Sequence, residues 1–245
     1  QTVQNCYIYG TDRAYKPVPR RIHPIHAQPF PDDSPIMPHR EISSRPTAEW
    51  PTLLLIVLCT AGWMAVTAHA AEIGLWLALP LLTVCLVLHS SLQHEVMHGH
   101  PTSDQRINDA LVFPALGLAI PYERFRDQHL AHHRDATLTD PYDDPESNYL
   151  DPAVWARLPR WQRVLLLANN TLAGRLLLGP AIGLAVFWAG EARALARGER
   201  RVIRAWALHA AGLAPVLAWL WAAGTVPAWA YLAAAYAALS ILKIR

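Results

Sequence analysis

The chain has 245 residues, of which 53% are hydrophobic and only 16% are charged. Soluble domains carry about 25% charged residues, so this composition excludes an ordinary soluble domain and favours an integral membrane protein. The formal net charge of +2 is too small for a nucleic-acid-binding protein, and the chain carries no nucleic-acid-binding motif. The three cysteines, Cys6, Cys59 and Cys85, form no metal-binding or redox pattern.

The first 45 residues differ in composition from the rest of the chain. They are rich in Pro, Arg and His and show no hydrophobic periodicity, which is typical of a disordered segment. Met37 begins a sequence that would suit a natural start, so we interpret the residues before it as upstream read-through. Residues 46–245 are predicted to form one membrane domain.

Long apolar runs predict that this domain is helical. Residues 52–71 and 73–92 each supply the roughly 20 apolar residues needed to cross a hydrocarbon core about 30 Å thick, and the short connection at Ala71-Glu72 makes them a hairpin. Residues 202–222 and 226–242 form a second hairpin. The predicted fold is therefore an all-α integral membrane protein with two transmembrane hairpins and about four spans.

Two further apolar segments lie between the hairpins. Residues 110–121 are too short to span and contain Pro114 and Gly117, so we expect a re-entrant or interfacial segment. Residues 164–190 include two asparagines and an arginine, and their composition fits an interfacial position as well as a crossing one. The Asp- and Pro-rich residues 139–146 predict a turn-rich loop.

The distribution of Lys and Arg orients the predicted spans. The two hairpin turns carry neither residue, whereas basic residues flank every other predicted span end. The positive-inside rule then places the turns outside and the intervening region in the cytoplasm, provided that residues 164–190 do not cross. The densest basic cluster precedes the third span and consists of Arg193, Arg197, Arg200, Arg201 and Arg204.

Two groups of histidines follow the second predicted span. His94 and His98 are four residues apart and therefore share one helix face, and His129, His132 and His133 share a face at spacings i, i+3 and i+4. Two helices turned toward each other would gather five imidazoles in a small volume, where unpaired nitrogens are costly to bury. A bound metal would take their lone pairs. Imidazole suits Fe, Zn, Cu and Ni, so the residue type does not identify the metal.

The remaining histidines outside the predicted disordered segment have less regular positions. His100 follows a glycine and would have left the helix, so it is a less certain candidate ligand. His89 lies on the second span, one residue off a helical i−4 spacing from the first group, and is a weaker candidate. His69 and His209 are expected to be polar residues without a metal.

The first histidine group also matches a zinc-protease pattern. His94-Glu-Val-Met-His98 has the form H-E-x-x-H, in which Glu95 would act as general base. Membrane-embedded zinc proteases exist, so the setting does not exclude this alternative. The pattern is short, however, and a zinc protease needs only one further ligand, which would leave the second histidine group without a role.

In order, spacing and membrane setting, the two groups resemble the histidine boxes of the membrane fatty acid desaturase and hydroxylase superfamily. The run from His94 to Pro101 looks like the first box of bacterial members, and the run from Asp140 to Tyr149 looks like the sequence after their second box. The resemblance extends from about Trp50 to the end of the chain. It implies that the metal ligands are His94, His98, His129, His132, His133 and, less certainly, His100.

The same resemblance implies the chemistry and the partners. We expect two non-haem iron ions with O₂ as co-substrate, a lipid acyl substrate in a bacterial inner membrane, and a ferredoxin, rubredoxin or small haem protein as electron donor. The implied reaction is fatty acyl desaturation, with alkane, carotenoid or lipid hydroxylation as the related alternative. A membrane zinc protease and a non-catalytic membrane fragment are the alternatives of another class.

The chain departs from the family pattern at one point. The family's third histidine box lies after the last hairpin, whereas here the only histidine after His133 is His209. Five or six ligands do not fill two iron sites of the family's type. We therefore expect the membrane domain to be incomplete at its carboxyl end and the 245-residue chain by itself to bind iron poorly and to be inactive.

Overall fold

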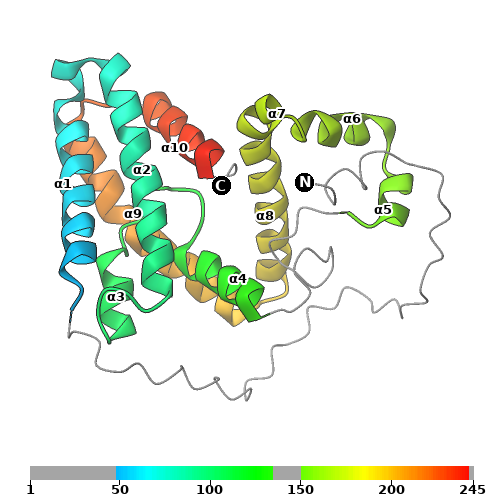
Figure 1. Cartoon of the computed structure of the whole chain (residues 1–245), viewed down its shortest axis with the longest axis horizontal. Helices are drawn as coiled ribbons and strands as arrows, with labels where there is room; N and C mark the ends of the chain where they lie inside the picture. Colours follow the sequence, from blue (N-terminus) through cyan, green and yellow to red (C-terminus); the bar gives the residue numbers. More distant parts are fainter. Residues whose placement is uncertain (1–47, 135–149, 243–245) are drawn as a thin grey trace. The chain divides into compact units, whose positions relative to one another are not determined.

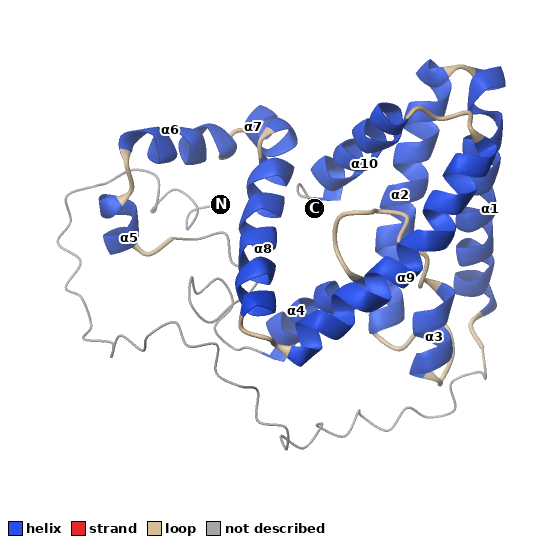
Figure 2. Cartoon of the chain, turned by 180° about the vertical axis from the view of Figure 1, so that it is seen from behind, coloured by secondary structure: helices blue, strands red, loops and turns tan. Residues whose placement is uncertain are grey.

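The computed structural model describes residues 48–134 and 150–242 (Figure 1). The predictions for the first 45 residues and for the turn-rich loop at 139–146 concern residues outside this description. Every regular element in the described ranges is a helix, as the secondary-structure view shows (Figure 2). The predicted all-α membrane fold is therefore confirmed.

The first predicted hairpin is formed by α1 (Trp50–Ile73) and α2 (Leu75–Met97). The break between them falls at Gly74, two residues later than the sequence suggested. Gly74 has φ +78°, a backbone conformation that suits glycine, and its N–H donates to the carbonyl of Ala70. A β-carbon at Gly74 would lie 2.9 Å from the ring of Trp76, so the turn also requires a residue without a side chain at this position.

The second hairpin is formed by α9 (Arg200–Ala223) and α10 (Ala228–Leu242). The described residues contain three helices long and apolar enough to cross a membrane, namely α1, α2 and α9. Helix α10 is apolar but has only 15 residues. Of the four expected spans, three therefore reach spanning length in the described residues.

Residues 164–190 do not form one helix. They are divided among α6 (Arg160–Asn169), α7 (Leu172–Leu177) and α8 (Gly179–Ala196), preceded by the short α5 (Pro152–Arg157). None of these helices meets the length and hydropathy of a spanning helix.

The hairpins are joined in their core by paired polar groups. The indole Nε1 of Trp63 in α1 donates to the hydroxyl of Tyr231 in α10 at 2.9 Å, and this hydroxyl donates to the carbonyl of Leu116 at 2.8 Å. All three residues are buried in one apolar cluster. Because water is scarce inside a membrane protein, such groups must satisfy one another, so the contacts fix the helices in one arrangement.

Residues 112–121 form an irregular segment between α3 (Gln105–Leu111) and α4 (Tyr122–Arg134). Besides Tyr231, two side chains reach its carbonyls: His209 bonds Leu118 at 2.9 Å, and Trp188 donates to Ala119 at 3.0 Å. Irregular backbone survives at membrane depth only where protein groups satisfy it. The segment forms no spanning helix, as predicted, and it delivers the chain to the start of α4.

Helix α4 is attached to α8 and α9 by a buried carboxylate. Arg124 donates to both oxygens of Glu191 in α8 at 2.8–3.0 Å, and the indole Nε1 of Trp206 in α9 donates to the same carboxylate at 3.0 Å. Glu191 is only 4% exposed. A bidentate arginine pair has a defined geometry, so these contacts set how α4 lies on α8 and α9.

Removing the Tyr231 hydroxyl should destabilise the helix bundle. Tyr231→Phe leaves the Trp63 indole and the Leu116 carbonyl without this partner, at a cost of about 1–3 kcal/mol for each buried group. The free energy of unfolding in detergent measures the loss. Tyr236→Phe is the matched control, because the Tyr236 hydroxyl bonds Leu177 at an exposed position on the same helix. Equal stability of the two variants would contradict the assigned role.

Glu191→Gln should weaken the attachment of α4. The substitution removes the close counter-charge of the largely buried Arg124 guanidinium and leaves it only the longer contact with Asp127 at 3.9 Å, which costs about 3 kcal/mol. Glu199→Gln removes an exposed carboxylate that pairs with Arg197 and should cost much less. Thermal unfolding of both variants tests the difference, and a Glu191→Gln protein as stable as Glu199→Gln would refute the inference.

Candidate metal centre

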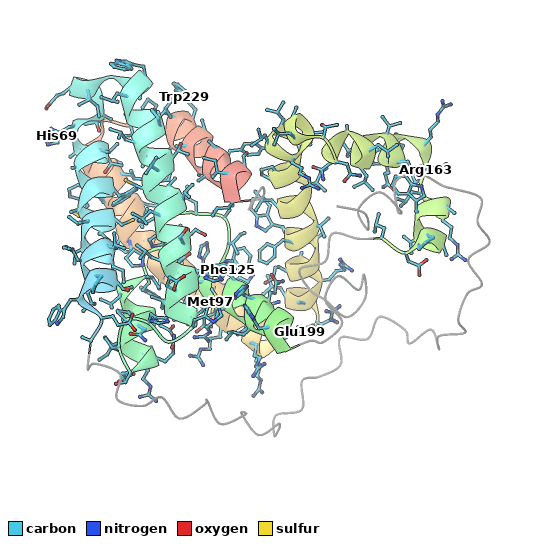
Figure 3. The ribbon with its side chains drawn as sticks, viewed as in Figure 1. His69, Met97, Phe125, Arg163, Glu199 and Trp229 are labelled. Atoms are coloured by element: carbon cyan, nitrogen blue, oxygen red, sulfur yellow. The ribbon has the colours of Figure 1, made fainter. Side chains whose placement is uncertain are left out.

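The end of α2 and the second half of α4 bring four histidines together. His94, His98, His129 and His133 each offer a ring nitrogen, and all four nitrogens lie within 4.8 Å of one another. Figure 3 labels two neighbours of this cluster, Met97 beside His98 and Phe125 one turn before His129. The two histidine groups thus face each other through these four residues, the arrangement in which the sequence would gather imidazoles in a small volume.

Local structure explains why each pair points the same way. His94 lies in the last turn of α2, and His98 is the residue that caps the helix end. Gly99 follows with φ +89°, so the helix stops there and His98 stays beside His94, with ring centroids 4.8 Å apart. In α4, His129 and His133 are separated by one helical turn, and their ring centroids are 4.5 Å apart.

The nitrogen distances fit a bound metal ion. His129 Nε2 lies 3.1 Å from His98 Nε2 and 2.9 Å from His133 Nε2. Two nitrogens bound to one ion at about 2.1 Å each would stand about 3.0–3.4 Å apart. A single imidazole nitrogen carries either one proton or one lone pair, so one hydrogen bond does not account for three converging nitrogens. A metal ion would use all of them.

The cluster is enclosed on one side and open on the other. His129 is buried at 8% exposure, whereas His98 and His133 are exposed and His94 is half-exposed. Partial burial and the neighbouring imidazoles His94, His129 and His133 lower the pKa of His98, which favours its neutral, metal-binding form. Metal sites that do chemistry keep such an open side for water or substrate.

Two predicted ligands are not shown to join the cluster. His132 lies in α4, but its side chain is outside the described part of the structure. His100 instead pairs with Glu49 just before α1, at 2.7 Å between Nδ1 and the carboxylate. This contact ties the loop after the first histidine group to the start of the first span.

The other histidines of the described residues, His69, His89 and His209, stand apart from the four-histidine cluster. His209 bonds the carbonyl of Leu118, and His69 bonds the exposed carboxylate of Glu72. His89 is buried within α2, more than a turn before His94.

The zinc-protease pattern also appears in the geometry, but it does not account for the whole cluster. Glu95 lies beside His94, with 3.5 Å between its carboxylate and Nδ1. A protease of this type needs a single further protein ligand and an open position. Here two histidines of α4 converge on the H-E-x-x-H pair, so the donor set holds more imidazoles than that chemistry uses.

The sequence did not reveal a group of polar contacts that joins α3 to α4. Asp109 in α3 accepts hydrogen bonds from Gln105, from the hydroxyl of Tyr122 and from Arg126, at 2.7–2.8 Å. Burial and then the Asp109 carboxylate raise the pKa of Tyr122, so its hydroxyl stays a donor. The only signal in the sequence was an acidic residue between the histidine groups, which by itself suggests a solvated surface.

Comparison with known proteins agrees with this centre. A family model described as fatty acid desaturase matches residues 71–244, a range that contains the five histidines of the two groups and His100. No curated protein and no solved structure matches the chain. The family match covers well over half of the 245 residues and includes the cluster that the fold assembles. The chain therefore belongs to the fatty acid desaturase family.

Proposed function

We propose that this protein oxidises a lipid acyl chain with O₂, most simply by desaturation, at an iron centre held by its histidines. The observation that carries the proposal is the convergence of four imidazole nitrogens from two separate helices, at the end of an apolar hairpin, in a member of the desaturase family. Family membership supports an oxidoreductase, and the cluster supports a metal. Iron, O₂ and the acyl substrate are our inference.

His94, His98, His129 and His133 would hold the metal, with His132 as a further expected ligand of a two-iron centre. When bound, iron would use O₂ and two electrons to supply the oxidising chemistry. That chemistry removes hydrogen from an unactivated C–H bond. The protein's part is to hold neutral imidazoles in place and to leave one side of the cluster accessible. His98 serves both purposes, because its pKa is lowered and its ring remains exposed.

An apolar groove supports an acyl substrate. A cavity of about 190 Å³ is lined by residues of the irregular segment, α8 and α10, among them Leu118, Trp188 and Tyr236. Its lining is almost entirely apolar, which suits a hydrocarbon chain. Leu118 is four residues before α4, so the segment that lines the groove also leads into the helix that carries His129 and His133.

Charge supports a cytoplasmic position for the cluster, where an electron donor would meet it. Arg204 at the start of α9 lies 3.7 Å from Glu123 of α4, so the basic α8–α9 turn is at the same end of the bundle as the histidine helix. The opposite turn of the second hairpin, near Gly224, carries no Lys or Arg. The positive-inside rule favours the basic end as cytoplasmic. A bacterial inner membrane and a ferredoxin, rubredoxin or small haem protein as donor complete the proposal.

Hydroxylation of a lipid, alkane or carotenoid is the second candidate. It uses the same histidine boxes, and the choice depends on how the C–H bond is placed, on a scale finer than residue types reveal. The product therefore has to be identified directly.

His129→Ala should remove most of the bound metal. This nitrogen is the one that both His98 and His133 approach, so its loss should weaken metal binding by on the order of 100-fold or more. The protein is expressed from its natural gene and purified, and elemental analysis then measures its iron and zinc content together. His69→Ala is the matched control, because it removes an exposed imidazole outside the cluster. Equal metal content in both variants would refute the site, and one zinc without iron would favour the protease.

Expression of the natural gene in a bacterial host should create a new double bond in membrane lipids. The product should depend on O₂ and should be absent with His129→Ala, since the cluster would be incomplete. Gas chromatography with mass spectrometry of the acyl chains measures it. A hydroxylated acyl chain would favour the second candidate. An unchanged lipid profile in the strain that expresses the wild-type gene would refute the proposal.

A further inference from the structure

The short helix α3 lies in the chain between the two helices that carry the histidines and contacts both through polar side chains. We propose that Asp109 in α3 is a positioning residue that sets the separation of α2 and α4 and thereby the geometry of the metal site. The inference rests on the proposed metal centre and adds a residue that acts on it from outside the cluster.

On the side of α2, the connection runs through Gln105. Its side-chain nitrogen donates to the backbone carbonyl of Val96 at 3.1 Å and to the Asp109 carboxylate at 2.7 Å. Val96 is fully buried and lies in the helical turn between His94 and His98. The amide group of Gln105 therefore joins the backbone of the first histidine group to Asp109.

A second contact attaches α3 to the loop after the first histidine group. Asn108 is completely buried, and its amide makes three hydrogen bonds to the backbone and hydroxyl of Thr102, at 2.7–2.9 Å. A buried amide held by three hydrogen bonds that use both its oxygen and its nitrogen has one orientation, so α3 is fixed with respect to the loop that follows His98. Asp109 is the next residue, so its position relative to this loop is fixed as well.

On the side of α4, Asp109 holds two residues of the first turns. Its Oδ1 accepts from the Tyr122 hydroxyl at 2.8 Å, and its Oδ2 accepts from Arg126 Nη1 at 2.8 Å. Arg126 is three residues before His129 and therefore lies close to it on the helix surface. Charge-assisted hydrogen bonds are shorter and stronger than neutral ones, so this contact resists sliding of α4.

The metal site is sensitive to the position that Asp109 controls. His98 Nε2, at the end of α2, and His129 Nε2 in α4 are separated by 3.1 Å. A shift of α4 by about 0.5 Å is enough to move a ligand out of productive geometry. The Glu191 contact has a different effect, because it joins α4 to α8 and α9 and leaves the distance to α2 undetermined.

The test is a Co²⁺ titration of the purified protein in detergent micelles, followed by visible absorption, which reports both affinity and coordination. Asp109→Asn should weaken Co²⁺ binding by about 10- to 100-fold and alter the absorption bands, because it removes the charge that pairs with Arg126 and leaves one acceptor oxygen where Gln105, Tyr122 and Arg126 now share two. Glu123→Gln is the matched control. It also converts a carboxylate of this region into an amide, but its ion pair with Arg204 is long, at 3.7 Å, and Arg204 is largely exposed.

A second variant keeps the charge unchanged. Gln105→Met removes the link to Val96 without altering any charge, and it should lower the Co²⁺ affinity in the same direction. Circular dichroism and gel filtration establish that each variant is folded. Wild-type affinity and spectrum in folded Asp109→Asn or Gln105→Met would overturn the positioning role while leaving the metal centre intact. Co²⁺ binding by the wild type no tighter than by His129→Ala would overturn the metal centre, and the positioning role with it.

Discussion

Helix α4 carries half of the four-histidine cluster, yet its sequence is too polar to be held in place by hydrophobic packing. It contains arginines, acids and histidines on most of its turns. Two carboxylates take over this task, Glu191 through Arg124 and Asp109 through Arg126 and Tyr122. Both contacts are partly or fully shielded from water, where an ion pair with complete hydrogen bonding has a defined geometry. The candidate metal site depends on both contacts: Glu191 fixes α4 on α8 and α9, and Asp109, in the role we propose for it, sets the separation of α4 from α2.

The membrane bundle also influences the position of α4, through the irregular segment 112–121 that precedes this helix. It has little regular hydrogen bonding of its own, and side chains of α8, α9 and α10 complete it through Trp188, His209 and Tyr231. Close approach is possible because Gly212 lacks a side chain: a β-carbon there would lie 2.6 Å from the carbonyl of Phe113. The bundle thus determines where α4 begins, and the carboxylates determine how it continues.

The arrangement separates two requirements of a membrane oxidase of the kind we propose. The apolar hairpins provide a bundle that suits a hydrocarbon environment, with a groove beside the irregular segment. The histidines gather where α2 ends, at the basic end of the second hairpin, and one side of their cluster is open. In the function that we propose, the acyl chain would approach from the apolar side, and O₂ and the donor protein from the other.

Much of the fold followed from local physics. Long apolar runs must become helices in a membrane, because only intrahelical bonds satisfy the backbone there, so both hairpins were predictable. The helical spacing of the histidines likewise predicted which of them share a face, and the family resemblance agreed with the family match. Periodicity has little power over turn positions, and the first hairpin accordingly turns at Gly74, two residues beyond its predicted place.

Other features were decided only by tertiary structure. His100 belongs to the first histidine motif by sequence, yet Glu49, 51 residues earlier, pairs with it away from the cluster. Asp109 and Glu191 look like ordinary surface acids in the sequence, because a single carboxylate carries no periodic pattern. Their partners lie 17 and 67 residues away, and contacts of that kind exist only once the helices have packed. The sequence by itself thus determined the membrane helices and the histidine faces, whereas the distance between those faces was decided by long-range polar contacts.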